Sequence, residues 1–230
     1  MVFVINLLFR TDRREEIEKE LLTQGAAIDG AHIRLFEAVR PETADGFPSV
    51  GARGCFLSHL NVLKKAQQEG VERLLILEDD AHFSSDFLTT SQRTIDALQD
   101  APWDIYYAGY TEVDRIIPTG PVTQVAPDFE LQTTHAMAFN RKAIEAAIPF
   151  LEDMLRRPPG SPEGGPMHVD GAYNWLRKAN PDLQTVISTP QIITQRSSRS
   201  DITAKPALYS KLPLISVIRK FKSIVRSYRA

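Results

Sequence analysis

Three consecutive carboxylates, Glu78, Asp79 and Asp80, directly follow a short apolar run at residues 74–77. Like charges at one strand end repel each other, and their burial costs free energy unless a cation neutralises them. Oxygen ligands of this kind suit Mn²⁺ and Mg²⁺, which commonly hold substrate phosphates as well. In an α/β sheet the carboxyl end of a strand is also where ligands usually bind. The run therefore predicts a metal site for a phosphorylated substrate; the alternative is a solvated acidic turn.

The three carboxylates are expected to have different roles. If the extended backbone continues through them, Glu78 and Asp80 point to one side and Asp79 to the other. We expect Asp80 to be the main metal ligand, with Glu78 beside it. Asp79 would then bond to a ribose hydroxyl on the opposite side.

A second group of candidates follows the first predicted strand. Asn6, Arg10 and Arg13 lie where they could contact a base and a diphosphate at the carboxyl edge of the sheet. The alternative for Arg10 and Arg13 is that they are ordinary surface cations of the helix that follows. Taken alone, the sequence leaves both interpretations open.

The later part of the chain offers further candidates. His168 and Asp170 follow a Pro/Gly-rich stretch, 157–166, that we expect to act as a lid. Asp170 could be a general base and His168 a further metal ligand, although Asp170 is also a plausible helix N-cap. Gln195 belongs to a polar stretch that could close over phosphate or simply be a linker.

Strand-like runs alternate with helical patterns along most of the chain. This alternation predicts an α/β fold with a mostly parallel central sheet and flanking helices on both sides. Residues 110–131 are expected to form a hairpin or an irregular insertion. The predicted strands are 2–8, 33–38, 73–77, 103–109, 135–139 and 184–188, and the predicted helices are 12–24, 55–68, 88–98, 141–155 and 170–179.

Bulk properties limit the class of protein. With 230 residues, 43% of them hydrophobic and 24% charged, the chain has the composition of a soluble globular protein. A net charge of −2 argues against general nucleic-acid binding. One cysteine, Cys55, excludes an intrachain disulfide and fits a reducing compartment. Neither a signal peptide nor a long apolar segment is evident, so we expect a cytoplasmic location.

The C-terminal residues differ from the rest. We divide the chain into a domain at 1–205 and a basic amphipathic tail at 206–230, in which six cations and no anion follow residue 210. Such a helix on an acidic body indicates docking to an anionic membrane surface, here the inner face of a bacterial cytoplasmic membrane. The alternative is that its apolar stripe folds onto the domain.

Several of these segments together resemble a known family. The block Gly54-Cys55-Phe56-Leu57-Ser58-His59, followed about twenty residues later by Glu78-Asp79-Asp80, is similar to glycosyltransferase family 25. That family includes lipooligosaccharide and collagen galactosyltransferases. The resemblance covers roughly residues 2–202. Weaker agreement occurs in later blocks, at Thr134-His135-Ala136, at Asp170 and around Gln195.

The resemblance implies a GT-A-like fold, a UDP-sugar donor and Mn²⁺ or Mg²⁺. It further implies inverting transfer of a hexose, galactose or glucose, onto a glycan hydroxyl. On this basis Ser58 and His59 become substrate-binding candidates, whereas a lone helical histidine would otherwise be taken as structural. One departure is Ala136-Met137, where the family commonly has Ala-Tyr.

The sequence thus predicts a metal-dependent glycosyltransferase that acts on a lipooligosaccharide or related glycolipid. Two alternatives remain. One is a catalytically silent relative that binds nucleotide or glycan. The other is a metal-dependent phosphohydrolase, since acidic strand ends serve that chemistry too.

Overall fold

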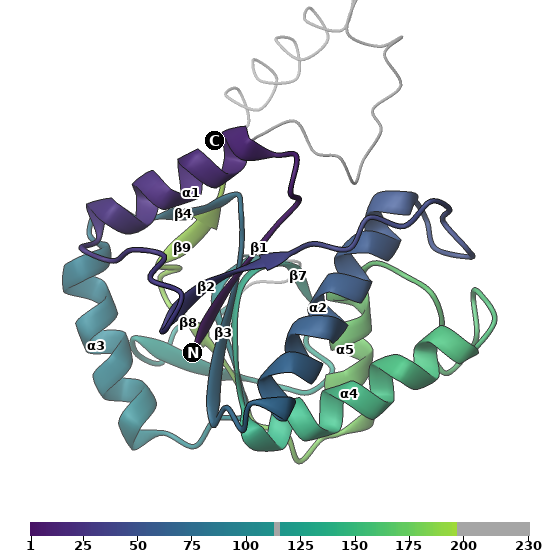
Figure 1. The fold of residues 1–230 in the computed structure, drawn as a ribbon. Helices are drawn as coiled ribbons and strands as arrows, with labels where there is room; N and C mark the ends of the chain where they lie inside the picture. The colour runs from purple at the N-terminus through teal and green to yellow at the C-terminus, as the bar shows by residue number, and fades with distance from the viewer. Residues whose placement is uncertain (113–115, 197–230) are drawn as a thin grey trace, which may run out of the picture.

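The computed structural model describes residues 1–112 and 116–196 (Figure 1). The predicted tail, 206–230, and its boundary with the domain lie outside the described residues. In the described part of the chain, no helix combines the length and apolarity that a membrane-spanning segment needs.

A seven-stranded sheet forms the centre of the molecule, with the order β2-β1-β3-β7-β5-β8-β6. β2, β1 and β3 are mutually parallel, β5 is parallel to β8, and β7 is antiparallel to both β3 and β5. Most strands therefore run in one direction, as predicted. The strands of this sheet are β1 Val2–Asn6, β2 Ile33–Glu37, β3 Arg73–Glu78, β5 Ile105–Glu112, β6 Val122–Val125, β7 Leu131–Asn140 and β8 Thr185–Ser188.

Helices cover both faces of the sheet (Figure 1). One face packs against α2, α4 and α5, and its core contains Phe56, Ile76 and Tyr173. The other face packs against α1 and α3, and its core contains Ile17 and Leu77. The predicted α/β layering is therefore confirmed. The helices are α1 Thr11–Thr23, α2 Val50–Gln68, α3 Phe87–Asp100, α4 Arg141–Arg156 and α5 Val169–Ala179.

The region between β5 and β7 is more regular than the sequence indicates. The hairpin or insertion expected there contributes β6, Val122–Val125, which pairs antiparallel with β8 at the sheet edge. A small second sheet was also missed: β4, Ala81–Phe83, pairs with β9, Ile193–Gln195. Strands of three residues carry too little periodicity to be recognised. This ladder nevertheless brings Gln195 beside the acidic run.

Helix α2 begins five residues earlier than predicted, at Val50. The Ser49 hydroxyl caps it by accepting from the Ala52 N–H at 3.0 Å. The added first turn brings Gly54 against the segment that follows β2. A Cβ at Gly54 would lie 2.6 Å from the Val39 carbonyl oxygen, so this close approach requires glycine.

Candidate functional site

A cavity of about 300 Å³ opens beside the carboxyl ends of β1 and β3. It lies between the N-terminal half of α2 and the segments that follow β1, β2 and β3, which is where α/β sheets usually bind ligands. The lining residues that concern the chemistry are Arg13, Cys55, Ser58, His59, Glu78, Asp79, Asp80 and Gln195. The fold thus brings the acidic run together with Arg13 from the second predicted group and Gln195 from the later part of the chain.

The Glu78 side chain contacts one residue of β7 and one residue of α2. Its Oε1 accepts from the Thr134 hydroxyl at 2.6 Å and lies 3.3 Å from Nε2 of His59. His59 is fully buried, and its Nδ1 lies 3.2 Å from the Tyr173 hydroxyl. Burial raises the pKa of Glu78, but the hydrogen bond and charge of His59, together with Thr134, outweigh it and lower the pKa overall.

Asp79 is held by the last residue of β1, Asn6, and by Arg13 on α1. Its two carboxylate oxygens accept separately from Asn6 Nδ2 and Arg13 Nη1, each at 2.8 Å. Burial nevertheless raises the pKa of Asp79, because Arg13 and Asn6 only partly offset the cost of desolvating the charge. The structure therefore uses Asn6 and Arg13 to fix one carboxylate at the cavity wall.

Asp80 is the least satisfied of the three carboxylates. Its Oδ2 accepts from Gln195 Nε2 at 3.0 Å and lies 3.8 Å from Arg13 Nη1. Its Oδ1 is buried and, in the described part of the chain, has no hydrogen-bond partner. Burial and then the charge of Glu78 raise the pKa of Asp80 to about 7. A buried carboxylate oxygen without a donor, beside other carboxylates, fits a hard divalent cation.

The simple alternation expected for the acidic run is wrong. β3 ends at Glu78, and Asp79 and Asp80 form the turn before β4. Since pleat geometry stops at the strand end, alternation does not decide where Asp79 and Asp80 point. All three carboxylates line the same cavity, but Glu78 contacts Thr134 and His59, whereas Asp80 accepts from Gln195.

Arg10 and Ser58 serve local structure as well. Arg10 binds Asp12 through two nitrogens, at 2.9 and 2.8 Å, and Arg10 is absent from the cavity lining. The Ser58 hydroxyl donates to the Gly54 carbonyl at 2.6 Å and accepts from the Val39 N–H at 2.8 Å. Ser58 thus ties α2 to the segment after β2 at the cavity wall.

Asp170 and His168 lie at the start of α5, outside the cavity lining. Asp170 accepts from the backbone N–H groups of Thr133, at 3.2 Å, and Gly171, at 2.8 Å. His168 is the exposed N-cap residue and makes no side-chain cap bond. The structure does not bring His168 to the acidic run, so its role as a metal ligand stays a prediction.

The Pro/Gly-rich segment 157–166 packs beside α4 and α5. The Arg157 guanidinium donates to the carbonyls of Glu163, at 2.7 Å, and Gly164, at 3.2 Å. Gly164 packs closely against Met154 and Trp175. None of this segment lines the cavity, so its closure as a lid stays a prediction.

The start of β7 links several parts of the site. Thr133 has a φ of 65°, a conformation that is costly for a β-branched residue. Thr133 bonds Asp170, Thr134 bonds Glu78, and His135 Nε2 lies 3.2 Å from the Ile193 carbonyl on β9. A Cβ at Gly109 would fall 2.1 Å from His135 and from Ile193, so glycine permits this crossing. Strain of this kind concentrates at functional sites.

Sequence reasoning missed some of the residues that complete the site. Tyr173 supports His59 from α5, and Thr134 bonds Glu78 although it entered the prediction only through a weak family block. The pairing of Thr134 with Glu78 follows from the antiparallel register of β7 on β3, in which Ala136 lies opposite Leu77. A single sequence carries no signal for that register, because both strands are buried on both faces.

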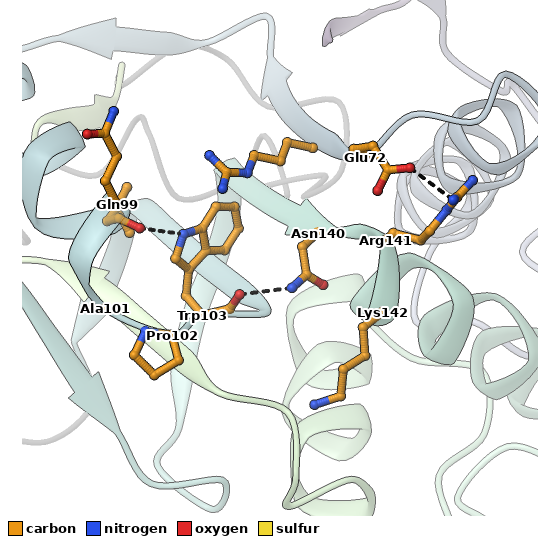
Figure 2. A pocket seen from close by; sticks show the side chains of 10 residues that line it. Glu72, Gln99, Ala101, Pro102, Trp103, Asn140, Arg141 and Lys142 are labelled. Carbon is orange, nitrogen blue, oxygen red and sulfur yellow. Dashed lines mark hydrogen bonds and ion pairs between the residues drawn. The ribbon is translucent and has the colours of Figure 1, made fainter.

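A second hollow, of about 480 Å³, lies at the other end of the strands, beside the amino end of β3 (Figure 2). Its charged groups are paired or stacked: Glu72 lies 2.9 Å from Arg141, and the Arg73 guanidinium lies 5.8 Å from the Trp103 ring centroid. Asn140 donates to the Trp103 carbonyl at 2.9 Å, and the indole N–H donates to a carbonyl of α3. No predicted site residue lines this hollow.

Comparison with known families decides the assignment. The family model described as glycosyltransferase family 25 (LPS biosynthesis protein) matches residues 1–116, half of the chain. The chain belongs to glycosyltransferase family 25. The matched half contains β1, α2, β3 and all three carboxylates, so the family assignment rests on the segments that form most of the cavity.

Curated relatives of this family 25 chain include both named enzymes and named inactive proteins. Procollagen galactosyltransferase 1 of Danio rerio is 32% identical over 126 residues, which are 47% of this chain and 21% of that protein. Inactive glycosyltransferase 25 family member 3 of Homo sapiens is 30% identical over 131 residues, 49% of this chain and 22% of that protein. The chain thus spans about a fifth of the length of the curated relatives that it matches.

A solved structure supports the fold over a longer span. A glycosyltransferase involved in the glycosylation of the major capsid of PBCV-1 matches with a TM-score of 0.54 and 14% identity. The match covers 86% of this chain and 93% of that chain. The GT-A-like fold that the sequence predicts is therefore confirmed.

Proposed function

We propose that this chain is a metal-dependent inverting glycosyltransferase. It moves a hexose, galactose or glucose, from a UDP-sugar to a lipooligosaccharide or a related glycan. The observation that carries the proposal is the buried Oδ1 of Asp80, which has no hydrogen-bond partner among the described residues and lies in a cavity lined by two further carboxylates. Membership of glycosyltransferase family 25 gives that cavity its chemical context.

Asp80 would hold Mn²⁺ or Mg²⁺, with Glu78 contributing negative charge from beside it. The bound ion supplies neutralisation of the charge that develops on the departing UDP. Arg13 lies at the same wall, 2.8 Å from Asp79 and 3.8 Å from Asp80, where it can bind a diphosphate oxygen. Asp79, fixed by Asn6 and Arg13, is oriented to accept from a ribose hydroxyl.

Asp170 is our candidate for the general base. In an inverting transfer the acceptor hydroxyl oxygen bonds to the anomeric carbon as the bond to UDP breaks, and the hydroxyl proton passes to a carboxylate. The two N–H bonds from Thr133 and Gly171 hold Asp170 in one orientation. Because Asp170 lies outside the cavity lining, the acceptor would approach from the α5 side.

Exposed apolar residues near the cavity fit an acceptor that is carried on a lipid. Leu8 is 70% exposed and Phe9 is 53% exposed, and both follow β1. Val50, at the start of α2, is 40% exposed, and Phe9 and Val50 line the cavity. We propose that this side faces the inner surface of the cytoplasmic membrane, with the tail at 206–230 as a second contact. Replacing Leu8 and Phe9 by serine should then lower sedimentation with anionic vesicles, whereas Leu22→Ser on α1 should leave it unchanged.

The proposed activity has a direct test. UDP-, GDP- and CMP-sugars are incubated with the full chain and Mn²⁺, with and without a lipooligosaccharide acceptor, and nucleotide release is measured. We expect UDP release that requires both the metal and the acceptor, and that disappears with EDTA. Release of phosphate from simple esters without sugar transfer would instead indicate a phosphohydrolase.

A catalytically silent relative is the second candidate, because several similar proteins are named inactive. Equilibrium dialysis with UDP and Mn²⁺ separates the two proposals. A chain that binds UDP in a metal-dependent manner, yet turns over none of the donors with acceptor present, would support the silent relative.

A further inference from the structure

Three side chains with metal-binding atoms meet at the inner end of the cavity. The sulfur of Cys55, a ring nitrogen of His59 and a carboxylate oxygen of Glu78 all lie within 4.8 Å of one another. Cys55 and His59 are four residues apart on α2, so they project from the same face of the helix. Glu78 reaches them from the end of β3.

This donor set differs from the one at Asp80. Thiolate and imidazole prefer Zn²⁺ and related softer ions, whereas oxygen-only sites prefer Mn²⁺ or Mg²⁺. Three protein ligands with one position left open are also typical of accessible zinc sites. All three residues line the cavity, so an ion from solvent can reach them.

The neighbours of His59 support an ion at this position. In the neutral tautomer that binds a metal, the ring N–H at Nδ1 donates to the Tyr173 hydroxyl, 3.2 Å away, and the Nε2 lone pair faces an ion beside Glu78. Metal-binding histidines usually have such a partner on the second nitrogen. The Nε2–Glu78 separation of 3.3 Å is long for a charge-assisted hydrogen bond, for which about 2.7–2.9 Å is usual. A cation between the two atoms would satisfy both.

Local charge acts in the same direction. Among the residues that the structure describes, the only ion pair of Glu78 is with His59, while Arg13 pairs with Asp79 and Asp80. Thr134, which bonds Glu78 at 2.6 Å, fixes the carboxylate without neutralising it. The inner end of the cavity therefore attracts cations.

We infer that Cys55, His59 and Glu78 form a binding site for a thiophilic divalent cation such as Zn²⁺, separate from the position at Asp80. Binding breaks the S–H bond of Cys55, forms a sulfur–metal bond and releases the proton to the buffer, without any redox change. The inference does not depend on transferase activity. An ion at Asp80 and an ion at Cys55 and His59 would therefore compete for the negative charge of Glu78.

Cobalt gives a test that reports the ligands directly. Co²⁺ is titrated into the metal-free full chain with a non-thiol reductant present, and the near-ultraviolet thiolate-to-cobalt band is recorded. Because Cys55 is the only cysteine in the chain, any such band identifies its sulfur. We expect the thiolate band to saturate at one Co²⁺ per monomer, to be lost on displacement by Zn²⁺, and to persist in a large excess of Mn²⁺.

Matched variants separate the two positions. Cys55→Ala should abolish the band and weaken Co²⁺ binding at least about tenfold, since even outer partners of metal ligands are worth 10–100-fold. Asp80→Asn should retain the band. X-ray absorption spectra of the zinc-loaded chain should show one zinc–sulfur distance near 2.3 Å and shorter zinc–nitrogen or zinc–oxygen distances.

Clear results would overturn the inference. Absence of the thiolate band in the folded chain, or equal Co²⁺ affinity in Cys55→Ala, would show that sulfur is not a ligand. A stoichiometry of one ion per two chains would show that the ion bridges two molecules instead. None of these outcomes bears on UDP release, so they are distinguishable from failure of the proposed function.

Discussion

Strand β3 joins two regions that handle charge in opposite ways. At its amino end, the hollow of Figure 2 pairs Glu72 with Arg141. Asp104, which directly follows Trp103 in the chain, accepts from Asn140, Lys142 and the Gln184 N–H, at 2.8 to 3.0 Å. At the carboxyl end, Asp80 keeps a buried oxygen that has no partner within residues 1–112 and 116–196. The first arrangement stabilises the fold, whereas the second has a stability cost that a ligand can offset.

The pKa directions of the two buried aspartates express this contrast. Burial raises the pKa of Asp104, but its hydrogen bonds and the Lys142 charge outweigh burial and lower the pKa overall. At Asp80, burial and Glu78 prevail and raise the pKa to about 7. The two hollows of this chain thus differ in how well their buried carboxylates are satisfied.

The largest expected effect is on catalysis. Asp80→Ala should lower the rate of sugar transfer by about 10³-fold or more, because a catalytic ion supplies several kcal/mol to the transition state. Initial rates with saturating donor and Mn²⁺ measure it. Glu72→Gln, at the other end of β3, should stay within about twofold of the wild type. Comparable losses in both variants would contradict the assignment of function to one edge.

A loss of stability is expected from a substitution near the amino end of β3. Asp104→Asn should lower the free energy of unfolding by about 2 kcal/mol at pH 7, because it removes a buried carboxylate that accepts from Asn140, the Gln184 N–H and the half-exposed Lys142. The folded pKa of Asp104 is lowered, so its contribution is present above the unfolded pKa and is lost as the pH falls through the folded pKa. Urea unfolding at pH 7 and pH 3 measures both; an equal deficit at the two pH values would argue against this cause.

A gain in stability is expected from a substitution at the carboxyl end of β3. Asp80→Asn should raise the unfolding free energy of the metal-free chain by about 2 kcal/mol at pH 8. Because the folded pKa of Asp80 is raised, the stability of the wild type is greatest below the unfolded pKa and falls as the pH rises through about 7.

The stability gain of Asp80→Asn over the wild type should therefore vanish near pH 4. Adding Mn²⁺ should stabilise the wild type more than the variant, since the ion binds only the folded site. If Asp80→Asn were destabilising at pH 8 without metal, the carboxylate would be satisfied after all. Thermal unfolding with and without EDTA provides the measurement.

The smallest effect concerns the two ends of β7. Thr133→Asn should stabilise the fold by about 0.5 kcal/mol, because asparagine tolerates the left-handed conformation better than threonine does. Asn140→Ala at the other end should cost about 1 kcal/mol, since Asn140 caps α4 through the Ala143 N–H at 2.9 Å. Chemical denaturation resolves the two signs. Stabilisation by Asn combined with slower transfer would further indicate that the strain at Thr133 serves the site.

Sequence reasoning succeeded where the information was local. The acidic run after β3, the strand–helix alternation and the helix that carries Ser58 and His59 follow from short-range patterns. It failed where geometry depends on distant pairing. The register of β7 on β3 decides that Thr134 meets Glu78, and the end of β3 at Glu78 decides how the carboxylates diverge. Neither is encoded by the residues of one segment alone.

The β4–β9 ladder has a consequence for the rigidity of the candidate metal site. The Arg196 N–H bonds the Asp80 carbonyl at 2.8 Å, and its guanidinium donates to the Asp79 carbonyl at 2.6 Å. The backbone of both aspartates is thus fixed by a residue that lies 117 positions after Asp79 in the chain. An ion that binds Asp80 meets a carboxylate on an ordered backbone, so its binding costs less conformational entropy than binding to a loose turn.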